Sequence, residues 1–61
     1  MRDPERIERI LALVRKVWYD GPDLRLTQII MNALVMSSDP YYVEDDKLEE
    51  ALKLLCKNRG I

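Results

Sequence analysis

The stretch from Leu26 to Met36, LTQIIMNALVM, is apolar at eight of its eleven positions. Wound as a helix of 3.6 residues per turn, it places these side chains around nearly its whole circumference. Such a helix must be buried on nearly all sides, and a chain of 61 residues has little with which to bury it. The stretch therefore predicts a helix over 26–36 that pairs with a second copy of the chain. The predicted dimer interface consists of Gln28, Ile29, Ile30, Asn32, Ala33 and Leu34.

Gln28 and Asn32 are the amide side chains of this stretch, and they stand four residues apart. Two interpretations are open. The amides can point to solvent or bond a facing loop. They can also meet the partner helix inside the interface, where a buried polar pair fixes the register at a cost in stability.

The residues before this stretch predict a first helix over about 4–19. Asp3 can cap it, and Pro4 suits the first helical position. Gly21 and Pro22 end it, because glycine accepts a left-handed cap and proline cannot continue a helix. Its apolar stripe repeats at three and four residues, with Leu13 off the stripe. The stripe consists of Ile7, Ile10, Leu11, Val14, Val17 and Trp18.

A third helix is predicted over about 46–58, after a break at Ser37-Ser38-Asp39-Pro40. Asp45 or Asp46 is the expected cap, and Asp46 with Glu49 has the spacing of a capping box. The apolar stripe of this helix consists of Leu48, Ala51, Leu52 and Leu55. We read Tyr41-Tyr42-Val43 as an ordered loop. Together the patterns predict an all-α protein of three short helices in a compact bundle, a single domain over 1–61.

The composition restricts the chemistry that the chain can perform. It has one cysteine and no histidine, so it can form neither an internal disulfide nor a catalytic Cys–His or Ser–His pair. We expect Cys56 to be a small buried hydrophobic residue. Carboxylates at three consecutive positions of a helix start diverge, so we expect no metal at Glu44, Asp45 and Asp46. The sequence predicts a non-enzyme with no cofactor and no metal.

The segment after the break is the predicted partner-binding surface. It consists of Tyr41, Tyr42, Glu44, Asp45 and Asp46. We expect one tyrosine to pack under the loop and the other to be a contact residue, since aromatic residues dominate interface hot spots. The carboxylates would form a charged rim suited to a partner rich in Lys or Arg. In the alternative interpretation, the tyrosines seal the core and the carboxylates only cap a helix.

Nucleic acid is the weaker candidate partner. Arg2, Arg6 and Arg9 form a basic edge on the first helix that could contact phosphates. Glu5 and Glu8 interrupt this edge, and the third helix begins with acidic residues. A small DNA-associated regulator that uses the basic edge is therefore the alternative function.

Two features of the sequence indicate where in the cell the protein acts. The charged start, RDPERIER after Met1, is unlike a signal segment, and no apolar run approaches the roughly 20 residues of a membrane span. A lone thiol fits a reducing compartment. We therefore expect a cytoplasmic protein with no membrane partner.

Three pieces of the chain resemble a group of small proteins of bacteria and their phages: MRDPERI, PDLRLTQIIMNAL and DPYYVEDDKLEEAL. The chain departs from this pattern at Thr27, where a small residue, usually glycine, is expected. In size and character the chain is also similar to the short phage proteins that counter the Hachiman defence system. The resemblance implies a compact all-helical protein of phage or mobile-element type and no established activity. Several phage proteins of this size bind and block host defence machinery, so the function that we expect is a non-enzymatic protein-binding module that inhibits a bacterial host protein in the host cytoplasm.

Overall fold

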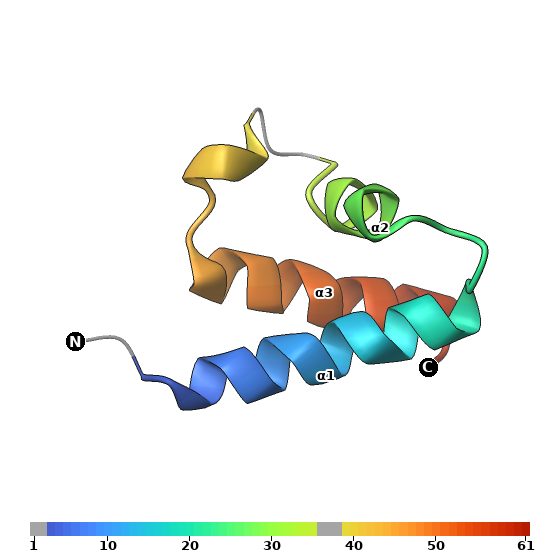
Figure 1. The fold of residues 1–61 in the computed structure, drawn as a ribbon, viewed down its shortest axis with the longest axis horizontal. Coiled ribbons are helices and arrows are strands. Elements are labelled where there is room, and N and C mark those ends of the chain that lie inside the picture. The colour runs from blue at the N-terminus through green and yellow to red at the C-terminus, as the bar shows by residue number, and fades with distance from the viewer. Residues whose placement is uncertain (1–2, 36–38) are drawn as a thin grey trace.

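The computed structural model describes residues 3–35 and 39–61 and is helical without strands in those residues (Figure 1). Its elements are α1 (Glu5–Asp20), α2 (Leu26–Ala33), the short 3₁₀ helix η1 (Pro40–Tyr42) and α3 (Asp45–Arg59). The predicted all-α fold of three helices is confirmed. The second helix is shorter than predicted, because Leu34 and Val35 already lie in a turn, and Met36 lies outside the described residues. Within the described ranges, no helix has the length and apolar character needed to cross a bilayer.

The helices α1 and α3 lie side by side and run in the same direction, while α2 crosses over them (Figure 1). The contact between α1 and α3 is the largest between any two elements. The core lies where the three helices meet, and its buried residues are Val14, Val17, Ile29, Leu52 and Cys56. Because α2 crosses back over the other two helices, α3 begins at the same end of the molecule as α1.

The core face of α1 is rotated from the predicted stripe. Leu13, which the pattern left off the stripe, packs against the core, whereas Leu11 is 56% exposed. Trp18 is also partly exposed, and its indole N–H donates a hydrogen bond to the carbonyl of Leu24 at 2.8 Å. The positions that face α2 and α3 are Ile10, Leu13, Val14 and Val17. One edge of the predicted stripe is thus left on the surface.

The ends of α1 follow the predicted residues but only partly the predicted geometry. The Asp3 carboxylate accepts a hydrogen bond from the Glu5 N–H at 2.9 Å, as predicted, but Pro4 occupies the N-cap and the helix begins at Glu5, one residue later than expected. Gly21 ends the helix at φ −130°, so the expected left-handed cap is wrong. Close packing explains this glycine, because a Cβ there would lie 3.1 Å from Leu24 Cδ1 and 3.3 Å from Arg59 Nη2.

The predicted cap of α3 is wrong at its beginning. The helix starts one residue earlier than expected, with Glu44 at the N-cap, so Asp45 and Asp46 both lie in the first turn. Glu49 does not close a capping box, because its carboxylate binds Arg9 on α1. The predicted stripe of α3 is confirmed: Leu52 is buried, and Leu48 and Leu55 pack against the core.

The far end of α3 carries the left-handed glycine cap. Gly60 has φ 74°, a conformation that favours glycine. Its N–H donates to the Lys57 carbonyl at 3.2 Å, and the Ile61 N–H donates to the Cys56 carbonyl at 3.0 Å. This pair of bonds is the Schellman motif, which satisfies two of the last carbonyls of the helix. The Cys56 side chain is buried, as predicted.

Candidate protein-contact surface

The predicted contact segment begins with a tight turn. The Asp39 carboxylate accepts a hydrogen bond from the Tyr41 N–H at 3.0 Å, and the Asp39 carbonyl accepts one from the Tyr42 N–H at 3.2 Å. The Val43 N–H then bonds the Pro40 carbonyl at 3.2 Å. Proline at the start and three local hydrogen bonds therefore hold the backbone of η1 in a defined shape.

Both tyrosines of η1 point away from the core. Tyr41 is 85% exposed and Tyr42 is 76% exposed, so the expectation that one of them packs under the loop is wrong. Their neighbours Pro40 and Val43 are half-buried and take the inward positions instead. The two rings meet edge to face, with centroids 5.0 Å apart and an interplanar angle of 79°. The interpretation in which these tyrosines seal the core is therefore excluded.

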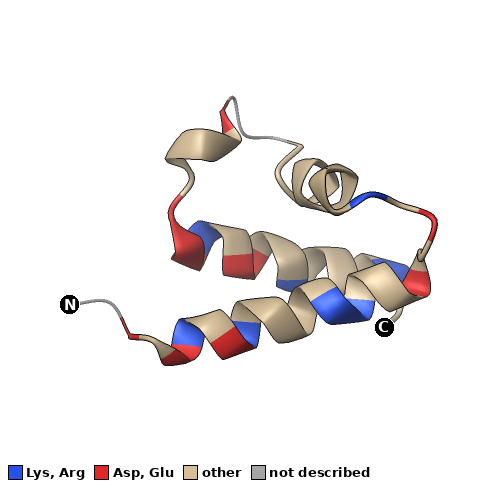
Figure 2. Ribbon diagram, in the orientation of Figure 1, with Lys and Arg blue, Asp and Glu red and all other residues tan. Residues whose placement is uncertain are grey.

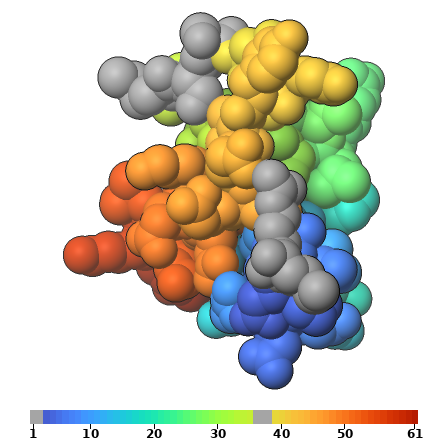
Figure 3. Space-filling view, turned by 90° about the vertical axis from the view of Figure 1, so that its left-hand side faces the viewer, coloured from blue at the N-terminus to red at the C-terminus, as the bar shows by residue number. Residues whose placement is uncertain are grey.

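The tyrosine turn stands at one end of the molecule. In Figure 3, which looks onto the end where α1 and α3 begin, the yellow segment rises above the orange start of α3. Glu44 and Asp46 are exposed there, and Asp45 is half-buried. The structure therefore brings together the five residues of the predicted surface: Tyr41, Tyr42, Glu44, Asp45 and Asp46.

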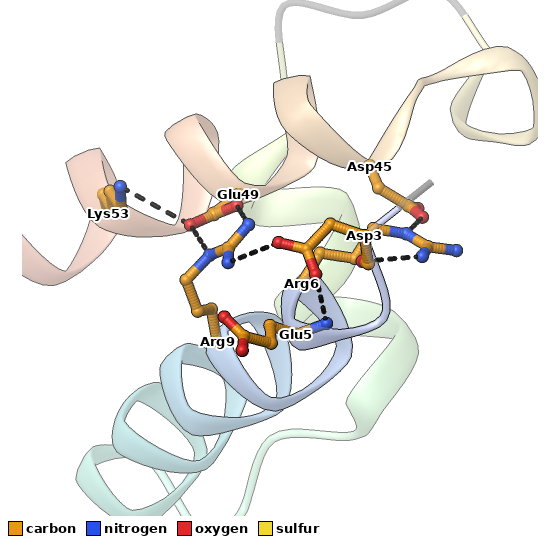
Figure 4. A network of polar contacts seen from close by, with 7 residues as sticks. All are labelled: Asp3, Glu5, Arg6, Arg9, Asp45, Glu49 and Lys53. Carbon is orange, nitrogen blue, oxygen red and sulfur yellow. Dashed lines mark hydrogen bonds and ion pairs between the residues drawn. The ribbon is translucent and has the colours of Figure 1, made fainter. Parts of the chain in front are cut away.

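Asp45 has a second role that the sequence did not indicate. Its Oδ2 accepts a hydrogen bond from Arg6 Nε at 2.7 Å, which joins the start of α3 to the first turn of α1 (Figure 4). The Arg6 guanidinium also donates to the Asp3 carbonyl at 3.0 Å. Arg6 thus connects both helix starts beneath the contact surface.

Three ion pairs join α1 to α3 in a ladder along their length. They are Arg6–Asp45 at 2.7 Å, Arg9–Glu49 at 3.0 Å and Asp20–Arg59 at 2.7 Å. The partners are 39, 40 and 39 residues apart in sequence. A nearly constant separation means that both helices advance in the same direction, and Figure 2 shows charged positions at the starts of both. Sequence reasoning missed this ladder because no local pattern indicates that two helices are parallel.

The second of these ion pairs, Arg9–Glu49, contains a carboxylate that is almost fully buried. Glu49 is only 8% exposed, and its carboxylate binds Arg9 through Nε at 3.0 Å and Nη2 at 3.5 Å. Lys53 Nζ lies 3.5 Å from the same carboxylate. The hydrogen bond from Arg9, with the charges of Arg9 and Lys53, lowers the pKa of Glu49 despite the opposing effect of burial. The same hydrogen bond raises the pKa of Arg9.

The predicted basic edge of α1 is largely neutralised by these contacts. Arg6 binds Asp45, and Arg9 binds Glu49 and approaches Asp3 at 3.5 Å. A phosphate group would have to compete with carboxylates already in place. Arg2 lies outside the described residues. Both described arginines of this edge are thus held by carboxylates of the chain itself.

The residues predicted for a dimer interface on the second helix differ in how far the single chain buries them. Ile29 is 0% exposed, and Leu34 is also buried. Both are covered within the single chain, so they cannot contact a second copy while the core is closed. Ile30 and Ala33 are half-buried and pack against the core.

The two amides of α2 are exposed in the single chain, which both interpretations allow. The Gln28 side-chain oxygen accepts a hydrogen bond from the Arg25 N–H at 2.8 Å. Gln28 therefore caps its own helix rather than reaching into the core. Asn32, one turn later, lies on the same exposed face.

The fold and surface define the chain as a small all-α protein with an exposed aromatic turn beside an acidic helix start. Comparison with protein-family models, with curated proteins and with solved structures finds no match for it.

Proposed function

We propose that the chain is a non-enzymatic protein-binding module whose tyrosine turn inserts into a pocket of a bacterial host protein and inhibits it. The observation that carries the proposal is the pair of adjacent tyrosines, 85% and 76% exposed, on an ordered turn. Two large exposed aromatic side chains carry a solvation cost that contact with a partner removes. Tyrosine is also among the residues that contribute most to interface hot spots.

The well-defined backbone of the tyrosine turn also supports a role in binding a partner. Binding is weakened by the entropy lost when loops and side chains become ordered at an interface. Here the backbone of η1 is already held by Asp39 and by the Pro40 ring. The rings of Tyr41 and Tyr42 also contact each other before any partner arrives. A preorganised aromatic pair therefore loses less entropy on binding than a disordered loop would.

The charge of the segment indicates the kind of pocket that it fits. Residues 39–46, DPYYVEDD, contain four acidic residues and no basic one. Glu44 and Asp46 are exposed beside the tyrosines in sequence. We therefore propose a partner with an apolar pocket edged by Lys or Arg, since complementary charges steer encounter and fix orientation.

The biological setting of the proposal comes from the resemblance of MRDPERI, PDLRLTQIIMNAL and DPYYVEDDKLEEAL to small phage and bacterial proteins. Several phage proteins of this size act by binding and blocking host defence machinery. We propose the same role for this chain in the bacterial cytoplasm, with a component of an anti-phage defence system as its target.

Affinity capture from bacterial lysate, read by mass spectrometry, tests this function. We expect Tyr42→Ala to lose the partner captured by the wild type while its melting temperature stays unchanged, because the side chain is largely in water. Tyr19→Ala is the matched control, since Tyr19 on α1 has the same exposed fraction of 76%. Capture that survives both Tyr41→Ala and Tyr42→Ala would show that the turn is not the contact surface.

A further inference from the structure

The outer face of α1 carries an apolar stripe that the monomer leaves uncovered. We define the α1 stripe as Ile7, Leu11, Val14 and Trp18. Ile7, Leu11 and Trp18 are large exposed hydrophobic residues, while Val14 is buried and forms the floor of a groove. This groove continues to Arg15, Tyr19 and Pro22 at the end of the helix.

The spacing of the α1 stripe matches that of a helix-pairing seam. Its members follow one another at intervals of four, three and four residues. That alternation is the heptad pattern by which two helices pack side by side. The α1 stripe shares Val14 with the core, but its exposed members Ile7, Leu11 and Trp18 lie apart from the core-facing positions Ile10, Leu13 and Val17, so they can be covered without opening the core.

One edge of the α1 stripe carries two charges of opposite sign. Glu8 follows Ile7 and Arg15 follows Val14, so both lie on the same side of the seam, one heptad apart. Glu8 makes no ion pair with any residue that the structure describes, and the Arg15 guanidinium lies over the Tyr19 ring at 5.9 Å. Seven residues of helix separate the two charges by about 10.5 Å along the axis, too far for them to pair within one chain.

We infer that two copies of this chain associate through antiparallel pairing of their α1 helices along the α1 stripe. Antiparallel pairing places Glu8 of each copy opposite Arg15 of the other, so the edge is complementary to itself. In a parallel pair each of these charges would instead face the residue five positions earlier on the partner helix, which is Asp3 for Glu8 and Ile10 for Arg15, so neither would gain an opposite charge. The charge pattern therefore selects a second copy, in the antiparallel orientation.

Self-association through α1 also fits the size of the chain. A domain of 61 residues buries a smaller fraction of its surface on folding than a larger domain does, and chains of this length are often stabilised by disulfides or by oligomerisation. A single cysteine excludes an internal disulfide. This inference does not depend on the tyrosine turn, which lies on η1 and leaves the α1 stripe uncovered.

Sedimentation of the intact chain and of two charge-reversal variants tests the inference. We expect the wild type to form a dimer of twice 7.2 kDa at about 100 µM. Glu8→Arg alone and Arg15→Glu alone each place like charges across both contacts. Each should therefore raise the dimer dissociation constant about tenfold. An equimolar mixture of the two variants restores opposite charges at both contacts, so it should form a heterodimer with nearly wild-type affinity.

Circular dichroism of each variant confirms that the helices are retained, and Leu11→Asp should abolish the dimer without loss of helicity. A wild type that is monomeric at this concentration would overturn the inference. A dimer that neither charge reversal weakens, or a mixture no tighter than its components, would overturn it as well, because association would then use another face or orientation.

Discussion

Glu49 shows how a single carboxylate can be kept charged against the core. It is 8% exposed, yet Arg9 and Lys53 both lie within ion-pair distance of its oxygens. The helix pattern alone suggested a capping role for this residue, because a glutamate three residues after Asp46 fits a capping box. Its true partner is 40 residues away, and a long-range ion pair of this kind leaves no local signal in the sequence.

The lowered pKa of Glu49 predicts a specific dependence of stability on pH. An unfolded glutamate titrates near 4.5, and the folded group titrates below that value. The native state therefore favours the ionised form, and its stabilising effect is present above about pH 4.5. This contribution is lost as pH falls through the folded pKa.

Glu49→Gln should therefore lower the free energy of unfolding at pH 7 and flatten its fall below pH 5. The matched control is Glu50→Gln, which removes an exposed carboxylate that pairs only with Lys53 at 3.7 Å among the described residues. Urea denaturation at a series of pH values measures both variants. Equal pH profiles for the two variants would contradict the role assigned to Glu49.

At the scale of the element, α1 carries two overlapping apolar stripes. Positions 7, 11, 14 and 18 form one, and positions 10, 13, 14 and 17 form the other. Helical periodicity predicts both equally well, and the sequence interpretation combined them while omitting Leu13. Only the positions of α2 and α3 decide which stripe is inside, so the existence of α1 was predictable and its orientation was not.

The orientation of α1 can be measured by two substitutions of the same kind. Leu13→Ala removes a side chain that packs against the core, so it should lower the free energy of unfolding by about 2 kcal/mol. Leu11→Ala removes one that is 56% exposed and should change it by less than about 1 kcal/mol. Thermal or urea unfolding at low protein concentration makes the comparison within single chains. A larger effect at Leu11 would mean that the originally predicted stripe faces the core.

The boundaries of the elements were largely readable from glycine, proline and aspartate. Asp3 with Pro4 begins α1, Gly60 ends α3, and Asp39 with Pro40 introduces η1. These residues act through their own backbone, so their effect does not depend on distant contacts. The exposure of Tyr41 and Tyr42 was not readable in the same way, because it depends on where η1 stands relative to the core.

At the scale of the whole molecule, the parallel arrangement of α1 and α3 organises both candidate surfaces. It brings the starts of the two helices to one end, where the ion pair of Arg6 with Asp45 supports the base of the tyrosine turn. It also leaves Ile7, Leu11 and Trp18 of the α1 stripe exposed. Short connections usually favour antiparallel neighbours, and here α2 supplies the crossing segment that makes the parallel pair possible.

Site-specific photo-crosslinking tests most directly the claim that the tyrosine turn contacts a host protein. A photoreactive phenylalanine analogue replaces Tyr42 in one preparation and Tyr19 in another, and each is irradiated in bacterial lysate. The two positions are equally exposed in the single chain, so they sample random encounters equally when the chain is irradiated well below about 100 µM, where the inferred α1 dimer dissociates. We predict that position 42 yields a covalent adduct with one bacterial protein and that position 19 does not capture that protein. Equal capture from both positions, or no adduct at position 42, would contradict the proposed function.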